Sequence, residues 1–427
     1  MNRIYPIILL IFALAIANED YTVASSLFDA GSFGDAQSRI NVAISAEPEN
    51  AQFFFLASKI AFKLDKLDEA WDHLLKAIDL DLDNTEFREE STRLTTIKNS
   101  LSDAKKSFDN GYYDESISGY ERINNQIPDF AMPYYLKGMV YYTQKDYDMA
   151  AESIKDAIKH NPFEDKYKAA LSNVVAILYN EGNDYFDRND FEEAAKKYEK
   201  ALVINPQFTE ALFKLAYLNY KLGDYQSCLN YLDRNIQIDP TSYKAFKLMG
   251  DTYNKMGDVS NAINSYINST QANTQYDRAY YALGQTYHTN GENDKAIEAL
   301  SQCVEINPTY GKGHETLGAV YQSVEKLDEA ISSFQSAILN NSKTKSVYYR
   351  LASAYNIKKD YENARAAAKS SLNLDQKYAA AHFELGMAEK CLGNKPAAKN
   401  AFEQAAKNKS WRKNAEFELK YIDQKCE

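Results

Sequence analysis

A unit of 34 residues recurs along almost the whole chain, and no other feature of the sequence restricts the fold as strongly. Pro206 and Pro240 are 34 residues apart, and Pro240 and Pro308 are 68 apart, which is twice that period. An Asn or Asp precedes each of these prolines. Self-similarity at a fixed period is the signature of repeat architectures, in which each unit packs against its neighbours. The recurrence therefore predicts a stack of similar units.

Each unit has room for two amphipathic helices. In the unit from Thr209 to Ser242, positions 4, 7 and 8 are apolar or small, and with position 11, which is Tyr in several other units, they fall on one side of a helix that turns by about 100° per residue. Positions 20, 24, 27 and 28 form the apolar stripe of a second helix. Gly223 and Asp224 lie between the two stripes, where the chain must turn. A single pair cannot bury both stripes, so successive pairs are expected to stack into an α-solenoid.

The unit resembles the tetratricopeptide repeat (TPR), a helix-turn-helix module with a period of 34 residues. The residues that carry the resemblance recur together, as in Gly250, Tyr253, Ala262 and Tyr266. Eleven units fit the register, and they begin at residues 17, 51, 97, 131, 175, 209, 243, 277, 311, 345 and 379. The resemblance implies an all-α chain, a right-handed superhelix of about eleven repeats, and a concave groove that binds peptides of other proteins.

The two ends of the chain and two breaks in the period complete the expected organisation. Residues 1–17 have the layout of a secretory signal peptide, with Arg3, an apolar stretch and an Ala15-Ile16-Ala17 cleavage site. Residues 85–96 and 165–174 interrupt the period without Gly or Pro, so we expect each to lengthen the first helix of the next unit. The predicted segments are repeats 1–2 in residues 18–84, repeats 3–4 in 97–164, repeats 5–11 in 175–412 and a single capping helix in 413–427.

The predicted leader indicates export. Its apolar stretch is shorter than the roughly 20 residues that a membrane helix needs, so we expect cleavage after Ala17 and no membrane span in the mature chain. The expected location is the periplasm or the cell exterior, or the lumen of the endoplasmic reticulum if the source is eukaryotic.

Charge and motif content exclude several classes of function. The formal net charge of −11 argues against a nucleic-acid partner, which needs a basic surface. Residues 18–174 contain 28 acidic and 17 basic side chains, whereas residues 175–427 contain 32 and 31, so an acidic partner would bind the second part. The five His lie in five different units, and no G-x-S-x-G or Walker-type loop occurs. We therefore expect no enzymatic activity, cofactor, metal ion or small-molecule substrate.

The four cysteines fall into two groups. Cys228 and Cys303 occupy small positions of the apolar stripes, two units apart, and are expected to be buried free thiols. Cys391 and Cys426 could face each other across adjacent helices. A disulfide between them is a hypothesis, because helix axes are typically about 8–10 Å apart and the bond needs Cα atoms within about 7 Å. Export would favour the bond.

The candidate binding surface lies on the first helix of each unit. Positions 2, 5, 9, 12 and 13 lie opposite the apolar stripe, and in TPR proteins they line the concave groove. Glu210 and Asp251 occupy two of these positions in three successive units. The same positions also carry an aromatic and basic set there: Phe213, Tyr217, Tyr220, Lys221, Lys244, Lys247, Arg278, Tyr281 and His288. A secondary groove in the fourth unit carries Met132, Tyr135, Met139 and Tyr142. The alternative for the aromatic side chains is ordinary packing, since the chain contains 33 Tyr.

The sequence therefore suggests a non-enzymatic, exported scaffold that binds a peptide or helical segment of another protein in its groove. Two alternatives remain open at this point. The first is a periplasmic or lumenal co-chaperone that holds unfolded chains, with exposed Tyr and Met side chains as adaptable contacts. The second is an arm that recruits substrates to an enzyme on another chain.

Overall fold

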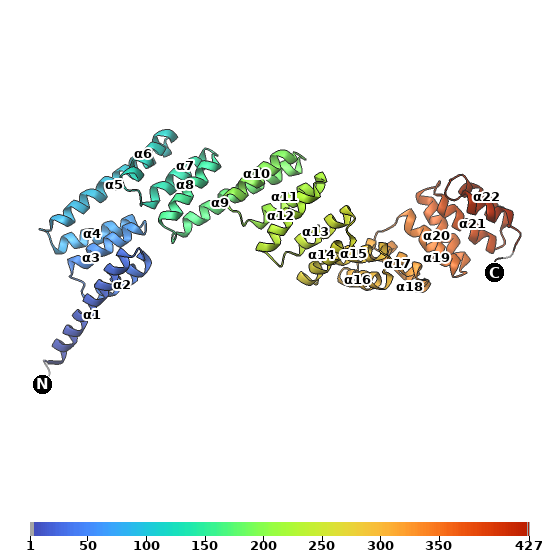
Figure 1. The fold of residues 1–427 in the computed structure, drawn as a ribbon, viewed down its shortest axis with the longest axis horizontal. Helices are drawn as coiled ribbons and strands as arrows, with labels where there is room; N and C mark the ends of the chain where they lie inside the picture. Colours follow the sequence, from blue (N-terminus) through green and yellow to red (C-terminus); the bar gives the residue numbers. More distant parts are fainter. Residues whose placement is uncertain (1–3, 425, 427) are drawn as a thin grey trace. The chain divides into compact units, whose positions relative to one another are not determined.

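The computed structural model describes residues 4–424 and residue 426, and these residues form 23 helices and no strand (Figure 1). The expected all-α class and the α-solenoid of helical repeats are confirmed. The helices are α1 (Ile4–Asp29), α2 (Phe33–Ala46), α3 (Ala51–Lys63), α4 (Leu67–Leu80), α5 (Thr85–Asp109), α6 (Tyr113–Gln126), α7 (Ala131–Thr143), α8 (Tyr147–His160), α9 (Asp165–Asp187), α10 (Phe191–Ile204), α11 (Thr209–Leu222), α12 (Tyr225–Ile238), α13 (Tyr243–Met256), α14 (Val259–Ala272), α15 (Asp277–Thr289), α16 (Asn293–Ile306), α17 (Gly311–Ser323), α18 (Leu327–Leu339), α19 (Lys345–Ile357), α20 (Tyr361–Leu374), α21 (Ala379–Cys391), α22 (Lys395–Ala406) and α23 (Arg412–Lys420).

The chain divides into two compact units, unit 1 in residues 1–211 and unit 2 in residues 212–427. Within unit 1 the helices pack as pairs from α1 with α2 to α9 with α10, and within unit 2 they pack as pairs from α13 with α14 to α21 with α22. The second helix of a pair also packs against the first helix of the next pair, as α14 does against α15. The core is therefore a series of small clusters, each shared by neighbouring pairs.

Small residues allow the two helices of a pair to approach closely. Gly250 of α13 lies against the ring of Tyr266 on α14, and a Cβ added at Gly250 would come within 2.5 Å of the ring carbon Cε1. The same contact joins Gly318 to Phe334 and Gly386 to Phe402. A glycine at position 8 thus accommodates a large ring at position 24.

The turn inside each pair contains one residue with a left-handed backbone conformation, always at position 15 of the repeat. Glycine occupies this position in six pairs, among them Gly257 with φ of 82°. The other five left-handed turn residues are Asp65, Lys145, Asn189, Glu325 and Lys359. Since only glycine adopts this conformation without strain, the five other turns must be stabilised by their surroundings.

The two insertions are helical. Helix α5 has 25 residues and α9 has 23, whereas the other first helices after α1 have 13 or 14. Phe87 and Leu94 in the added part of α5 are buried in the cluster that α5 shares with α3 and α4. Repeat 2 therefore packs against the added part of α5.

Helix α1 spans most of the predicted leader, and the C-terminal end of the chain differs in part from expectation. Helix α1 runs through the predicted cleavage site, and Arg3 lies outside the described residues. In the part of the chain that the structure describes, no helix is both long and apolar enough to cross a membrane. The expected single helix over the last residues is shorter: α23 ends at Lys420, and the chain turns from Tyr421 so that Cys426 meets Cys391.

Candidate functional site

A hollow of about 360 Å³ lies on the first helices α15, α17 and α19 of unit 2. We call it the inner groove. Its main lining residues come from the three helices in turn: Tyr281, Gln285, His288, Lys312, Glu315 and Arg350. Helix α17 also contacts both α15 and α19 directly. The inner groove is therefore formed by the face of the repeats that lies opposite the apolar stripes.

Three side chains of the inner groove are held by neighbours outside it. The ring of Tyr281 packs edge-on against Tyr310, with ring centroids 5.2 Å apart. His288 Nδ1 lies 2.9 Å from Asn293 Oδ1, and Glu315 Oε2 accepts a hydrogen bond of 2.8 Å from the Ser342 hydroxyl. These contacts fix the walls of the groove before any ligand enters.

Two cations of the inner groove remain available. Neither Lys312 nor Arg350 forms an ion pair with a carboxylate among the described residues. Lys312 is exposed and Arg350 is half-buried, so the guanidinium group is partly shielded from water. A half-buried guanidinium group presents several donors in one plane and can grip a carboxylate with two parallel hydrogen bonds.

Tyr281 and His288 are the two predicted site residues that line the inner groove. Phe213, Tyr217 and Tyr220 are instead half-buried against the core cluster around α12 and α13. Lys221 lies with its ammonium group 5.6 Å from the ring centroid of Tyr217. Much of the aromatic surface predicted on α11 is therefore used in packing.

The predicted basic residues of α13 and α15 differ in what they can offer a ligand. Lys247 forms an ion pair of 2.6 Å with Asp251, which also accepts a hydrogen bond of 2.9 Å from the Tyr266 hydroxyl. Lys244 and Arg278 are exposed. Arg278 lies close enough to Tyr310 to affect its hydroxyl. Burial raises the pKa of Tyr310 to about 12, and the positive charge of Arg278 opposes that shift. Lys247 is thus engaged by Asp251, whereas Lys244 and Arg278 form no ion pair with a carboxylate among the described residues.

Sequence reasoning missed Lys312, Glu315 and Arg350. Lys312 and Glu315 occupy positions 2 and 5 of the ninth repeat, which belong to the inner stripe. Arg350 occupies position 6 of the tenth repeat, one step outside the stripe. Extending the stripe beyond the first cluster of aromatic residues would have found the first two.

The secondary groove of α7 is largely filled by its own unit. Met132 packs against the cluster that contains Phe62 and Phe130, and the ring of Tyr135 lies 4.8 Å from that of Tyr167. Further along the helix Met139 is half-buried, and the ring of Tyr142 packs edge-on against Tyr147 at 6.0 Å. At Met132 and Tyr135 this surface is therefore not an open groove.

A buried carboxylate, Asp65, links repeats of unit 1 that are not neighbours in the sequence. Asp65, in the turn of repeat 2, accepts hydrogen bonds from the Met132 backbone N–H at 3.1 Å, the Asn161 amide at 2.7 Å and the Tyr167 hydroxyl at 3.0 Å. Burial raises the pKa of Asp65, and these hydrogen bonds oppose the shift. Repeat 2 is thereby tied to helices α7 and α9, which belong to repeats 4 and 5.

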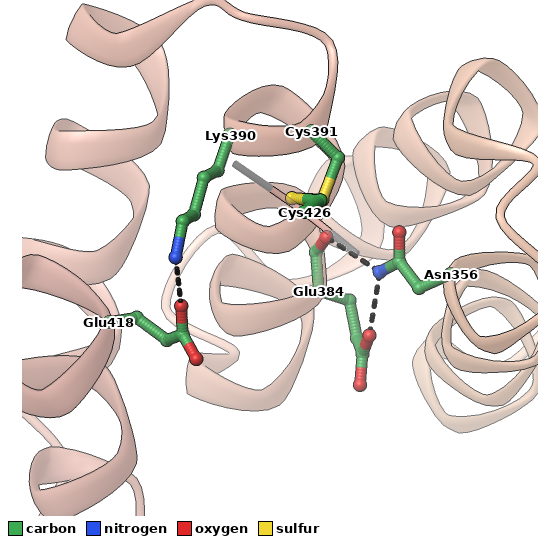
Figure 2. The surroundings of a disulfide bond; sticks show 6 residues. All are labelled: Asn356, Glu384, Lys390, Cys391, Glu418 and Cys426. Carbon is green, nitrogen blue, oxygen red and sulfur yellow. Dashed lines mark hydrogen bonds and ion pairs between the residues drawn. A yellow bond between two sulfur atoms is a disulfide. The ribbon is translucent and has the colours of Figure 1, made fainter. Parts of the chain in front are cut away.

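A disulfide joins Cys391 at the end of α21 to Cys426 in the final segment, with the two Cα atoms 5.4 Å apart (Figure 2). Beside it Lys390 forms an ion pair of 2.7 Å with Glu418, which ties α21 to α23. The Asn356 amide donates to the carboxylate of Glu384 at 2.7 Å, and burial raises the pKa of this carboxyl. Cys228 and Cys303 are buried free thiols. Within residues 4–424 and residue 426, no group of three or more His, Cys, Asp or Glu could hold a metal ion.

Five family models match parts of the chain, and two of the matches overlap at residues 210–223. Three tetratricopeptide repeat models match residues 21–85, 133–163 and 210–242, and a TPR repeat model matches residues 182–223. The model of the tetratricopeptide repeat protein 21 C-terminal ARM domain matches residues 263–385.

Curated relatives are similar to parts of this chain. The peroxisomal targeting signal receptor of Candida glabrata is 26% identical over 117 residues, which cover 27% of this chain and 18% of the receptor. The TPR repeat-containing protein MJ1428 of Methanocaldococcus jannaschii is 25% identical over 224 residues, 51% of this chain and 37% of the relative. The chain thus spans less than two fifths of the length of these relatives.

Solved structures are similar to part of this chain. The crystal structure of MamA is 30% identical, with a TM-score of 0.36, and the match covers 38% of this chain and 95% of MamA. The structure of YrrB, titled a TPR protein with an unusual peptide-binding site, is 19% identical with a TM-score of 0.40, over 44% of this chain and 96% of YrrB. Repeat models match the chain at intervals from residue 21 to residue 242, and similar helix pairs build both compact units. The chain therefore contains tetratricopeptide repeats.

Proposed function

We propose that this chain is an exported, non-enzymatic scaffold that binds a peptide segment of a partner protein in the inner groove. TPR proteins act as protein-interaction scaffolds, which supports the general assignment. One observation carries the proposal that the inner groove binds the peptide. Tyr281 lies there with two cations, Lys312 and Arg350, that have no carboxylate partner among the described residues.

The chemistry of the inner groove favours an acidic segment. Arg350 offers a planar set of donors to a carboxylate, and Lys312 adds a mobile positive charge. The ring of Tyr281 offers apolar area with a polar tip, and Gln285 adds an amide within the same hollow. Glu315 is engaged by Ser342, so it opposes the two cations less than a free carboxylate would.

Two features support export as part of the proposal. The A-x-A site and the apolar stretch before it have the pattern of a cleavable leader. The disulfide between Cys391 and Cys426 is of a kind that persists in oxidising compartments and is rare where thiols are kept reduced.

Site-specific photocrosslinking in the organism of origin tests the function. A photoreactive amino acid replaces the exposed Gln285 in the inner groove, and a control chain carries it at Lys295, an exposed residue of α16. We expect one crosslinked partner from Gln285 and none of the same mass from Lys295. Adding Lys312→Glu and Arg350→Glu should remove that product.

The other outcomes separate the alternatives. Many unrelated crosslinked chains from Gln285 would indicate a co-chaperone, and a single partner with enzymatic activity would indicate a recruiting arm. A partner captured equally well with and without the two charge reversals would place the binding surface outside the inner groove. Fractionation of the cells reports independently on export.

A further inference from the structure

A second hollow, of about 320 Å³, lies at the C-terminal end of unit 2, apart from the inner groove. We call it the edge cleft. Residues from two loops and the helices next to them line it: Gln376, Lys377 and His382 on one side, and Gln404, Lys407 and Asn408 on the other. Ala379 completes the lining, which contains no Asp or Glu. The edge cleft shares no residue with the inner groove.

The surroundings of the edge cleft carry a local excess of positive charge. Residues 395–413 contain six basic side chains and one acidic side chain, in a chain whose formal net charge is −11. Lys395 and Lys399 are compensated, because they pair with Asp423 and Glu403. Five other cations form no ion pair with any described carboxylate: Lys377, Lys407, Lys409, Arg412 and Lys413.

From this arrangement we propose that the edge cleft is a second docking site, and that its ligand is an acidic polypeptide segment. Amide side chains and cations alternate along its walls, and both groups donate hydrogen bonds to carboxylate oxygens. The His382 ring nitrogen Nε2 lies 2.8 Å from the Gln376 carbonyl oxygen, which holds the ring at the wall of the cleft. Charge complementarity thus selects the acidic segment.

An anionic membrane surface fits the same charges less well. Basic segments that bind membranes usually place aromatic or aliphatic side chains into the lipid. The aromatic residue of this loop, Trp411, packs against the protein itself. Its ring centroid lies 5.0 Å from that of Phe383 and 6.2 Å from that of Tyr349. The loop from Lys407 to Trp411 therefore has no large apolar side chain to insert into lipid.

The edge cleft is also held in shape before binding. One wall belongs to α21, which the disulfide and the Lys390–Glu418 ion pair join to the segment after the cleft (Figure 2). Trp411 anchors the other wall against α19 and α21. A preformed site loses less conformational entropy when a ligand binds. With two separate sites, the chain can hold two acidic segments at the same time.

The test uses the full mature chain with the inner groove disabled by Lys312→Glu and Arg350→Glu. The probe is a fluorescein-labelled decapeptide of alternating Glu and Gly, and the readout is fluorescence anisotropy at low and physiological salt. We expect this chain to bind the probe. Adding Lys377→Glu and Lys407→Glu should weaken binding at least tenfold. A matched chain with Lys105→Glu and Lys168→Glu, exposed lysines of unit 1, should change it less than about twofold.

Two results would overturn the proposal. The first is an equal loss of affinity in the edge-cleft and unit 1 variants, which would mean attraction by net charge alone. The second is tight binding to vesicles of phosphatidylserine and phosphatidylcholine, lost on Lys377→Glu and Lys407→Glu, without binding of the peptide.

The milder variant Lys377→Gln and Lys407→Gln repeats the measurement in case charge reversal disturbs folding, and circular dichroism checks the helix content. Failure of photocrosslinking at Gln285 would leave the edge cleft unaffected.

Discussion

At the scale of single residues, the close approach of two helices at Gly250 predicts whether Gly250→Ala raises or lowers the free energy of unfolding. Gly→Ala inside a helix normally stabilises it by up to about 1 kcal/mol. At Gly250 the new methyl group would meet the fully buried ring of Tyr266, whose hydroxyl is held by Asp251. We therefore expect Gly250→Ala to lower the free energy of unfolding by about 1–3 kcal/mol.

The matched control for this prediction is Gly34→Ala in α2. Nothing lies within 4 Å of a Cβ added at Gly34, so this change should be neutral or slightly stabilising. Urea unfolding of both variants measures the difference. Equal effects at the two positions would mean that the helices of repeat 7 do not approach each other as described.

The buried carboxyl of Asp65 predicts how the stability of the folded chain depends on pH. Burial raises the pKa of its carboxyl in the folded chain above the ordinary value of 3.8, so the folded state binds this proton more tightly than the unfolded state does. The stabilisation linked to this proton is complete below pH 3.8 and is lost as pH rises through the folded pKa. Relative to Asp65→Asn, the wild-type chain should therefore become less stable as pH rises from about 4 to 7.

The measurement for Asp65 follows unit 1 alone. Trp71 is half-buried in the cluster shared by α3, α4 and α5, and its fluorescence can be isolated in a Trp411→Phe background. The difference in unfolding free energy between the wild-type and Asp65→Asn chains is recorded at several pH values. A difference that grows in favour of wild type as pH rises would contradict the prediction.

At the scale of structural elements, the C-terminal helix α23 depends on its crosslink. The disulfide closes a loop with a sequence separation of 35 residues, and by the chain-entropy estimate a bond of this span stabilises by about 4 kcal/mol. Reduction by a dithiol, or Cys391→Ser with Cys426→Ser, should speed amide hydrogen exchange in α23. Exchange in α15 and α17 should stay unchanged, because these helices pack elsewhere. Unchanged exchange in α23 would show that packing of Ala415 on α22 suffices.

The helical elements were predictable from the sequence because the same pattern of residue types recurs in many repeats. A small residue at position 8, a large one at position 24 and a turn at position 15 appear in most copies, so a weak signal in one copy is recovered from the others. The inner groove was predictable only in part. Tyr281 and His288 lie in it, but Phe213, Tyr217 and Tyr220 pack against the core, and no periodic pattern distinguishes a half-buried ring from an exposed one.

The tie made by Asp65 could not have been predicted. Its partners Met132, Asn161 and Tyr167 lie two and three repeats away, whereas a repeat pattern describes contacts between neighbours. Pairing of Lys247 with Asp251, by contrast, follows the ordinary i, i+4 spacing and could have been anticipated.

At the scale of the whole molecule, each compact unit contains one of the two tryptophans, Trp71 in unit 1 and Trp411 in unit 2. Repeat proteins unfold in stages when coupling along the array is weak. We therefore expect single-tryptophan chains, made by Trp411→Phe or Trp71→Phe, to report urea transitions with different midpoints. Adding a reductant should shift the Trp411 transition and leave the Trp71 transition in place. Coincident transitions under both conditions would mean that the chain unfolds as one cooperative body.

The tie at Asp65 also affects the order of events during biosynthesis. A repeat in an ordinary solenoid can complete its packing once the next 34 residues have been made. Asp65 must wait for Tyr167, which follows 102 residues later. At translation rates of about 5–20 residues per second, this delay lasts roughly 5 to 20 s. During that time the turn of repeat 2 holds a carboxylate in water that it will later bury, so repeats 2 to 5 can reach their final form only together.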